Sequence, residues 1–254
     1  MQALDKALAQ VGSVLLGKPE QLKLALACML AGGHLLIEDL PGMGKTTLAH
    51  ALARVFRLDY RRVQFTSDML PADILGVSVF DPESQQFSLR EGPVFSQLLL
   101  ADEINRASQL DRFLMRISLG YPSPDVELSL LAGGDLREAV RELKPVIEPT
   151  GLVKLIAHVG KVRATRDLLD YVQRLLEATR ADDRLVTGLS PRAGLGLLRA
   201  ARAWALIHDR DYVLPEDVQA VWPSVAEHRL QPREGGQVSA MTQALLQTVP
   251  VVRH

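Results

Sequence analysis

A short stretch near the N-terminus brings together the residue types that bind a polyphosphate. Residues 35–49 read LLIEDLPGMGKTTLA, an apolar run followed by a glycine-rich turn and a helical pattern. The turn consists of Pro41, Gly42, Met43, Gly44, Lys45, Thr46 and Thr47. Glycines let phosphates approach the backbone closely, and the amide N–H groups at the start of a helix point toward them. Lys45 can meet the charge of the β- and γ-phosphates and the Thr46 hydroxyl can ligate Mg²⁺, so the pattern predicts a phosphate-binding loop.

The literal phosphate-loop pattern fails at its first position. The motif G-x-x-x-x-G-K-[ST] begins with glycine, whereas this chain has Asp39 there. The residues around this position still fit a phosphate loop, because a strand-like run leads through Gly44, Lys45 and Thr46 directly into a helix. A chance glycine-rich helix start is the simpler alternative, and this context makes it the weaker one.

A second apolar run, residues 98–107 with the sequence LLLADEINRA, contains two adjacent acidic residues. Open α/β sheets bind their ligands at the carboxyl ends of the strands. Asp102 is then placed to hold the Mg²⁺ shell, and Glu103 to orient or deprotonate an attacking water. An Asp-Glu pair after a strand is more often part of a solvated loop, but its place 57 positions after Lys45 (102 against 45) favours a functional role.

Both motifs need a sheet to position them, and the hydrophobic pattern predicts one. Strands are expected over residues 34–37, 62–65 and 97–101, helices over 20–31 and 46–56, and a hairpin over 77–80 and 87–89. Strands that alternate with helices predict an α/β fold, with a parallel sheet covered on both faces.

From about residue 120 the pattern becomes helical. Pro191 and Pro215 suit the first turn of a helix, and Ser190 can cap the helix that follows it. We therefore expect an α/β domain over residues 1–122, followed by a smaller all-helical domain over 123–254. Its helices are expected over residues 124–131, 149–159, 165–179, 191–207 and 215–225.

Composition and charge exclude several classes of protein. The 254 residues are 47% hydrophobic and 23% charged with a formal net charge of −1, which disfavours disorder and bulk electrostatic capture of nucleic acid. The single cysteine, Cys28, rules out an internal disulfide and a multi-cysteine zinc site. No uncharged apolar run approaches 18 residues, and the N-terminus is unlike a secretory signal. We therefore expect a cytoplasmic protein without membrane insertion.

Five segments of the chain resemble those of the MoxR-type AAA+ ATPases. They read HLLIEDLPGMGKTTLA, FTSDMLPADILG, EGPVFSQLLLADEINRA, QLDRFLMRISLGYPS and SPRAGLGLLRAARAWALIHDRDYVLPEDV, in order along the chain. In that family Asp commonly stands at the first phosphate-loop position, and Gly17-Lys18 lies where the family has Gly-Gln. The resemblance implies a P-loop AAA+ domain followed by a helical lid, with ATP and Mg²⁺ as cofactors. It also implies a homo-oligomer, expected to be a hexameric ring, that acts chaperone-like on protein partners, often ones with a von Willebrand A domain.

The resemblance also implies roles for two arginines. Arg112, in QLDRF, lies where the family has the arginine finger that reaches the γ-phosphate of a neighbouring subunit. Arg192, in SPRA, matches the sensor-2 arginine at the start of a lid helix. Either side chain can neutralise charge on the transferring phosphoryl group. The simpler alternatives are a surface pair of Arg112 with Asp111 and a solvated first-turn position for Arg192.

One departure from the family pattern is large. Only residues 107–111 separate Arg106 from Arg112, where the family has a helix and a further strand that ends in the sensor-1 residue. The short connection is either a true deletion or an unrecorded segment, and sensor 1 has no position in this chain. If the deletion is true, the sheet must either close directly or leave an inner edge open, and hydrolysis should be poor.

Two functions therefore remain open. The leading one is an AAA+ ATPase that binds and hydrolyses Mg-ATP and remodels or activates a protein partner. The alternative is a nucleotide-gated binding module in which loss of the sensor-1 segment impairs hydrolysis. A P-loop GTPase is disfavoured because the chain lacks an Asn-Lys-x-Asp motif, and a DNA helicase because the charge is near neutral.

Overall fold

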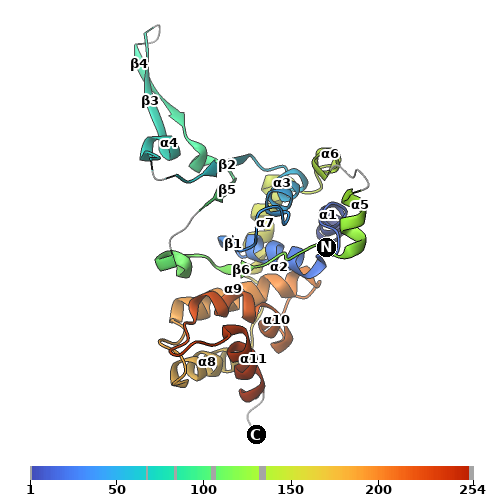
Figure 1. Ribbon diagram of the computed structural model, residues 1–254, viewed down its shortest axis with the longest axis vertical. Helices are drawn as coiled ribbons and strands as arrows, with labels where there is room; N and C mark the ends of the chain where they lie inside the picture. The colour runs from blue at the N-terminus through green and yellow to red at the C-terminus, as the bar shows by residue number, and fades with distance from the viewer. Residues whose placement is uncertain (1, 67, 83–84, 104–106, 132–135, 252–254) are drawn as a thin grey trace.

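Figure 1 shows the computed structural model of the protein, which describes residues 2–66, 68–82, 85–103, 107–131 and 136–251. The strands are β1 (Leu35–Ile37), β2 (Tyr60–Gln64), β3 (Gly76–Asp81), β4 (Gln86–Glu91), β5 (Leu98–Asp102) and β6 (Met115–Ile117). The α-helices are α1 (Gln2–Gly12), α2 (Pro19–Leu30), α3 (Lys45–Val55), α4 (Pro71–Leu75), α5 (Pro124–Leu131), α6 (Leu136–Glu142), α7 (Pro149–Val159), α8 (Arg166–Ala181), α9 (Pro191–Ile207), α10 (Pro215–Ala226) and α11 (Val238–Thr248). Short 3₁₀ helices lie at η1 (Pro93–Phe95), η2 (Ala107–Arg112) and η3 (Glu227–Arg229).

The predicted α/β fold class is confirmed, with parallel strand pairs at its centre. β1 pairs with β6, with Leu36 opposite Arg116, and β2 pairs with β5, with Arg62 opposite Leu100. Parallel strands need a crossover connection, which is usually a helix. α3 follows β1 and leads into β2, which pairs with β5 rather than with β1.

The two parallel pairs do not join into one sheet. Among the described residues, β1 has no strand partner other than β6, and β5 has none other than β2. Of the two arrangements expected for a short connection, the structure has the one with an open inner edge, and the two strand pairs do not close directly against each other. The reason is chain length, because residues 103–114 between β5 and β6 are too few for a crossover helix and an inner strand. Arg106, one boundary of the short connection, lies outside the described residues.

The five helices predicted for the C-terminal half are present and begin within one residue of the expected positions, whereas the sequence pattern did not predict α6 and α11. Ser190 caps α9 by accepting a hydrogen bond from the Ala193 amide at 3.2 Å, and Thr165 caps α8 through the Leu168 amide at 3.3 Å. Trp222 of α10 is fully buried among these helices. α9 also packs on α2, so the helical half lies against the β1–β6 pair (Figure 1). None of the helices in the described ranges is both long enough and apolar enough to span a bilayer.

Residues beyond the expected boundary at 122 return to the α/β part of the chain. α6 packs on α3, and the amides of Val146 and Ile147 donate to the Val55 carbonyl at 2.8 and 3.1 Å. Val140 of α6 is buried at this contact. The division of the chain at residue 122 therefore stays a prediction.

The predicted β3–β4 hairpin is antiparallel and projects away from the other elements in Figure 1. Phe80 pairs with Phe87 across it, with ring centroids 5.1 Å apart. Gly76 at its base has φ +90°, and a Cβ there would lie 2.1 Å from the Arg90 carbonyl oxygen. A glycine is therefore required where the two strands meet.

Candidate functional site

The predicted phosphate loop connects β1 to α3 through two glycines in left-handed conformations. Gly42 has φ +87°, and Gly44, the N-cap of α3, has φ +91°. Residues with a Cβ disfavour positive φ, so glycine at both positions allows the chain to turn here. Residues 43–47 are half-buried, whereas Pro41 and Gly42 are exposed.

The first turn of α3 leaves its amide groups available. The first helical hydrogen bond runs from the Leu48 amide to the Gly44 carbonyl at 2.9 Å, and no side chain caps the helix. The amides of Lys45, Thr46 and Thr47 are therefore without an intrahelical acceptor, as at other helix N-termini. Open amides and the helix dipole favour an anion at such a position, so the predicted residues remain the candidate site for a phosphate.

Asp39, the departure from the phosphate-loop motif, has contacts of its own. Its Oδ1 accepts hydrogen bonds from the Ser118 hydroxyl at 2.7 Å and the Gly120 amide at 3.0 Å, and its Oδ2 accepts one from the Leu119 amide at 2.6 Å. Its main-chain carbonyl accepts a hydrogen bond from Lys45 Nζ at 2.7 Å. The sequence pattern did not identify Asp39 as a site residue. The signal that could have identified it is the acid that stands where the motif has glycine.

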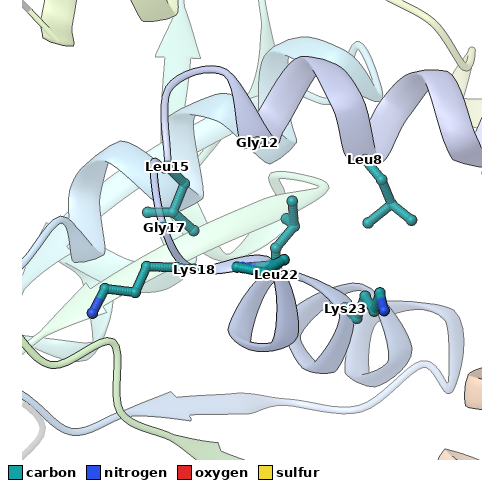
Figure 2. Close-up of a pocket in the computed structure, with 8 residues that line it drawn as sticks. Leu8, Gly12, Leu15, Gly17, Lys18, Leu22 and Lys23 are labelled. Atoms are coloured by element: carbon teal, nitrogen blue, oxygen red, sulfur yellow. The ribbon is translucent and has the colours of Figure 1, made fainter. Parts of the chain in front are cut away.

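The turn between α1 and α2 packs beside the loop. A Cβ placed on Gly44 would lie 3.7 Å from Leu15 Cδ1. Figure 2 shows the pocket between these helices, where Leu15 and Leu22 are among the lining side chains and Lys18 lies at one side. Lys18 Nζ donates a hydrogen bond to the Tyr121 carbonyl at 2.6 Å. The N-terminal turn therefore contacts both the phosphate loop and the segment after β6.

The two acidic residues lie at the carboxyl end of β5, as predicted, but their side chains bind β2. Asp102 Oδ2 accepts a hydrogen bond from Arg62 Nε at 2.6 Å, and Glu103 Oε1 accepts one from Gln64 Nε2 at 3.0 Å. Glu103 is exposed and has φ +61°. Within the described residues, no hydrogen bond or ion pair joins either carboxylate to the phosphate loop. The structure therefore does not bring the two predicted motifs together.

Arg112 ends η2 with an exposed side chain. Asp111, the partner in the simpler alternative for this arginine, pairs instead with Arg229 at 3.1 Å. In the part of the chain that the structure describes, Arg112 has no hydrogen-bond or ion-pair partner. Its guanidinium is thus free to contact another molecule.

Arg192 is exposed in the first turn of α9. Burial lowers the pKa of the Arg229 guanidinium, and the nearby charge of Arg192 lowers it further. Arg229 also donates to the Leu114 carbonyl at 3.1 Å, directly before β6. Since residues 118–120 bind Asp39 after β6, Arg112 and Arg192 lie at the opposite end of this strand from their own phosphate loop.

Comparisons with known proteins agree with this geometry. Residues 34–115 match the ATPase family associated with various cellular activities (AAA), and residues 177–249 match the AAA lid domain. The fold is similar to the crystal structure of an ATPase candidate from Cytophaga hutchinsonii, with a TM-score of 0.86 and 25% identity. That similarity covers 99% of this chain and 96% of the other.

Related sequences place the chain in one family. It is 34% identical to the uncharacterised protein YeaC of Bacillus subtilis, over 98% of this chain and 94% of that protein. It is 31% identical to Chaperone MoxR1 of Mycobacterium tuberculosis, over 91% and 76%, and 31% identical to Protein MoxR of Paracoccus denitrificans, over 96% and 94%. The YeaC alignment runs over 302 positions against 254 residues here, so at least 48 of its positions lack a counterpart in this chain. By its phosphate loop, its parallel strand pairs and these relatives, the chain belongs to the MoxR family of AAA+ ATPases.

Proposed function

We propose that this protein binds ATP at the phosphate loop. The supporting observation is the uncapped first turn of α3, which presents open amides next to two left-handed glycines and the Lys45 ammonium. A polyphosphate would replace the Asp39 carbonyl as the acceptor for Lys45, since a charged acceptor makes the stronger hydrogen bond. The apolar pocket that includes Leu15 lies beside this loop and suits a nucleoside base.

Thr46 is the oxygen ligand proposed for Mg²⁺, which would neutralise phosphate charge, and Asp102 is the second ligand that the sequence predicts. Thr46 fits this role, because it stands in the first turn of α3 among the open amides. Asp102 does not fit it in this structure, because its carboxylate is ion-paired with Arg62 at 2.6 Å. Glu103 is the residue proposed to orient or deprotonate the attacking water.

ATP binding is tested with Lys45→Ala. Loss of the ammonium removes a charge-assisted hydrogen bond, so we expect calorimetry to show ATP affinity reduced by about 10- to 100-fold, with helical content intact. Lys154→Ala removes the same charge from an exposed position on α7 and should bind ATP like the wild type. Unchanged ATP affinity in Lys45→Ala would show that the nucleotide binds elsewhere.

We also propose a chaperone-like action on a protein partner in the cytoplasm, performed by a hexameric ring. The family and the relative named Chaperone MoxR1 support a protein partner, for which a von Willebrand A-domain protein is the class that the resemblance implies. Arg112 and Arg192 support a ring, because they lie away from their own phosphate loop and can act on a neighbour's nucleotide. The net charge of −1 gives no support for nucleic acid as a partner.

The separation of the two strand pairs favours a second candidate function. Asp102 and Glu103 bind side chains of β2, and β5 has no described strand between it and β1. Catalytic groups that stand away from the bound substrate contribute little to its reaction. This geometry favours a nucleotide-gated binding module that holds ATP and hydrolyses it poorly.

The two candidates differ in the effect of Glu103→Gln on steady-state phosphate release. If the chain hydrolyses ATP, loss of the base should reduce turnover by on the order of 100-fold or more, with ATP affinity unchanged. Glu91→Gln, at an exposed position on β4, removes the same charge and should leave turnover unchanged. If the wild-type chain, of verified mass, binds ATP but releases no phosphate above a protein-free control, the binding module is supported. Wild-type turnover in Glu103→Gln would remove this residue from the mechanism.

A further inference from the structure

Asp39 places a negative charge at the start of a loop proposed to bind a polyphosphate. Like charges repel, so a carboxylate facing the phosphates would weaken their binding. In this structure both carboxylate oxygens of Asp39 bind the segment of residues 118–120, which follows β6. The acid is thus directed to the protein rather than to the phosphate position.

The three hydrogen bonds to this carboxylate hold the segment 118–120, and one of them satisfies the amide of a buried residue. Leu119 is only 1% exposed, and its amide donates to Asp39 Oδ2 at 2.6 Å. The Gly120 amide and the Ser118 hydroxyl donate to Oδ1. Glycine at position 39 has no carboxylate, so it would leave the Leu119 amide without this acceptor and the segment 118–120 without this support.

The same segment contacts the other end of the phosphate loop. A Cβ on Gly44 would lie 4.0 Å from Leu119 Cδ1, so the Leu119 side chain packs beside the N-cap of α3. Lys45, the next residue, donates to the Asp39 carbonyl. Asp39 thus contacts Lys45 through its main-chain carbonyl and the segment 118–120 through its carboxylate, and that segment packs beside Gly44.

We propose that Asp39 is a positioning residue for nucleotide binding and that it acts through its carboxylate. By binding residues 118–120 it fixes the loop between Asp39 and Gly44 in the conformation that presents Lys45 and the α3 amides. A loop ordered in advance avoids the entropy cost of ordering during binding. The inference rests on the proposed ATP site and adds a residue that the phosphate-loop motif does not contain.

The test compares Asp39→Asn with Glu38→Gln. Both substitutions remove one negative charge from adjacent positions, so electrostatic repulsion alone predicts that both bind ATP more tightly. Asn has only one acceptor oxygen, and its NH₂ group would face a donor, so Asp39→Asn loses at least one of the three hydrogen bonds with residues 118–120. Glu38 binds Arg116 at 3.0 Å and makes no such contact. We expect the Kd for Mg-ATP to rise about tenfold in Asp39→Asn and not to rise in Glu38→Gln.

Two further measurements separate positioning from folding. Without nucleotide, hydrogen exchange at the Leu119 and Gly120 amides should become faster in Asp39→Asn, while the thermal midpoint shows that the chain is folded. Ser118→Ala removes one donor from an exposed residue and should raise the Kd by a smaller factor, about two- to threefold. This variant carries the test if Asp39→Asn does not fold.

The outcomes distinguish this inference from the ATP site on which it rests. If the wild type does not bind Mg-ATP, the proposed function fails, and the role of Asp39 fails with it. If the wild type binds, Lys45→Ala loses binding, and the Kd values of Asp39→Asn and Ser118→Ala do not rise, only the positioning role is overturned. Faster amide exchange with an unchanged Kd would also overturn it, because the contact would then be structural alone.

Discussion

At the scale of single residues, three neighbours after α10 hold β6 in place. Glu227 accepts a hydrogen bond from Arg116 at 3.4 Å, and Arg229 donates to backbone carbonyls before the strand. Between them, His228 Nε2 lies 3.0 Å from the Phe113 carbonyl. A carbonyl only accepts hydrogen bonds, so Nε2 carries the proton, and Nδ1 is buried without a partner in the described part of the chain.

These surroundings predict a dependence of stability on pH. Burial, with a contribution from the charge of Arg229, lowers the pKa of His228 to about 4, from 6.5 for an ordinary histidine. Between these values the unfolded chain binds a proton that the folded chain does not. The stabilisation is therefore fully present above pH 6.5 and is lost as the pH falls to 4, by on the order of 3 kcal/mol.

Chemical denaturation between pH 7 and pH 4 measures this loss. His228→Gln is the matched variant, because Gln can still donate a hydrogen bond to the Phe113 carbonyl but does not titrate. We expect its free energy of unfolding to fall less steeply with decreasing pH. The same slope in both proteins would show that His228 takes up its proton without unfolding.

At the scale of elements, local signals made much of the fold predictable. α8 and α9 begin after Thr165 and Ser190. Two signals predict these starts, a side-chain oxygen that caps the helix and the apolar periodicity that follows it, and both lie within a few residues of the sequence. The phosphate loop was predictable for the same reason. Gly44 and Lys45 are adjacent in sequence, so the turn and the helix start need no distant contact.

β6 could not be predicted from such signals. It has three residues, with Arg116 between two buried apolar side chains, and this is too short for a periodic pattern. Its position depends on contacts with β1 and with Arg229, which lies far along the chain. The groups that donate hydrogen bonds to Asp39 follow β6, so these contacts could not be predicted from the sequence either.

The direction of the two acidic side chains also depends on distant contacts. The sequence placed Asp102 and Glu103 correctly at the end of β5. Their partners, Arg62 and Gln64, reach them only because β2 pairs with β5 in one particular register. A single strand pattern contains no information on that register, and in this register the acids bind β2 rather than the phosphate loop.

At the scale of the whole molecule, β6 separates the two arginines from their own phosphate loop. The four steps from Leu114 to Ser118 span about 13 Å at the usual rise of a strand. Arg112 precedes this stretch, and Asp39 binds the residues after it. We infer that the arginines complete a neighbour's site, which requires a head-to-tail interface of the kind that closes into a ring.

A mixing experiment tests this arrangement. Arg112→Ala and Lys45→Ala should each lack ATPase activity, but together they form interfaces in which an intact phosphate loop faces an intact arginine. With random assembly from equal amounts, about a quarter of the interfaces are of this kind, so we expect about a quarter of the wild-type phosphate release. The control mixes Arg112→Ala with the double variant Lys45→Ala/Arg112→Ala, which supplies no intact arginine and should restore nothing. If native mass spectrometry shows mixed rings and these remain as inactive as their parents, Arg112 does not act on the neighbouring subunit.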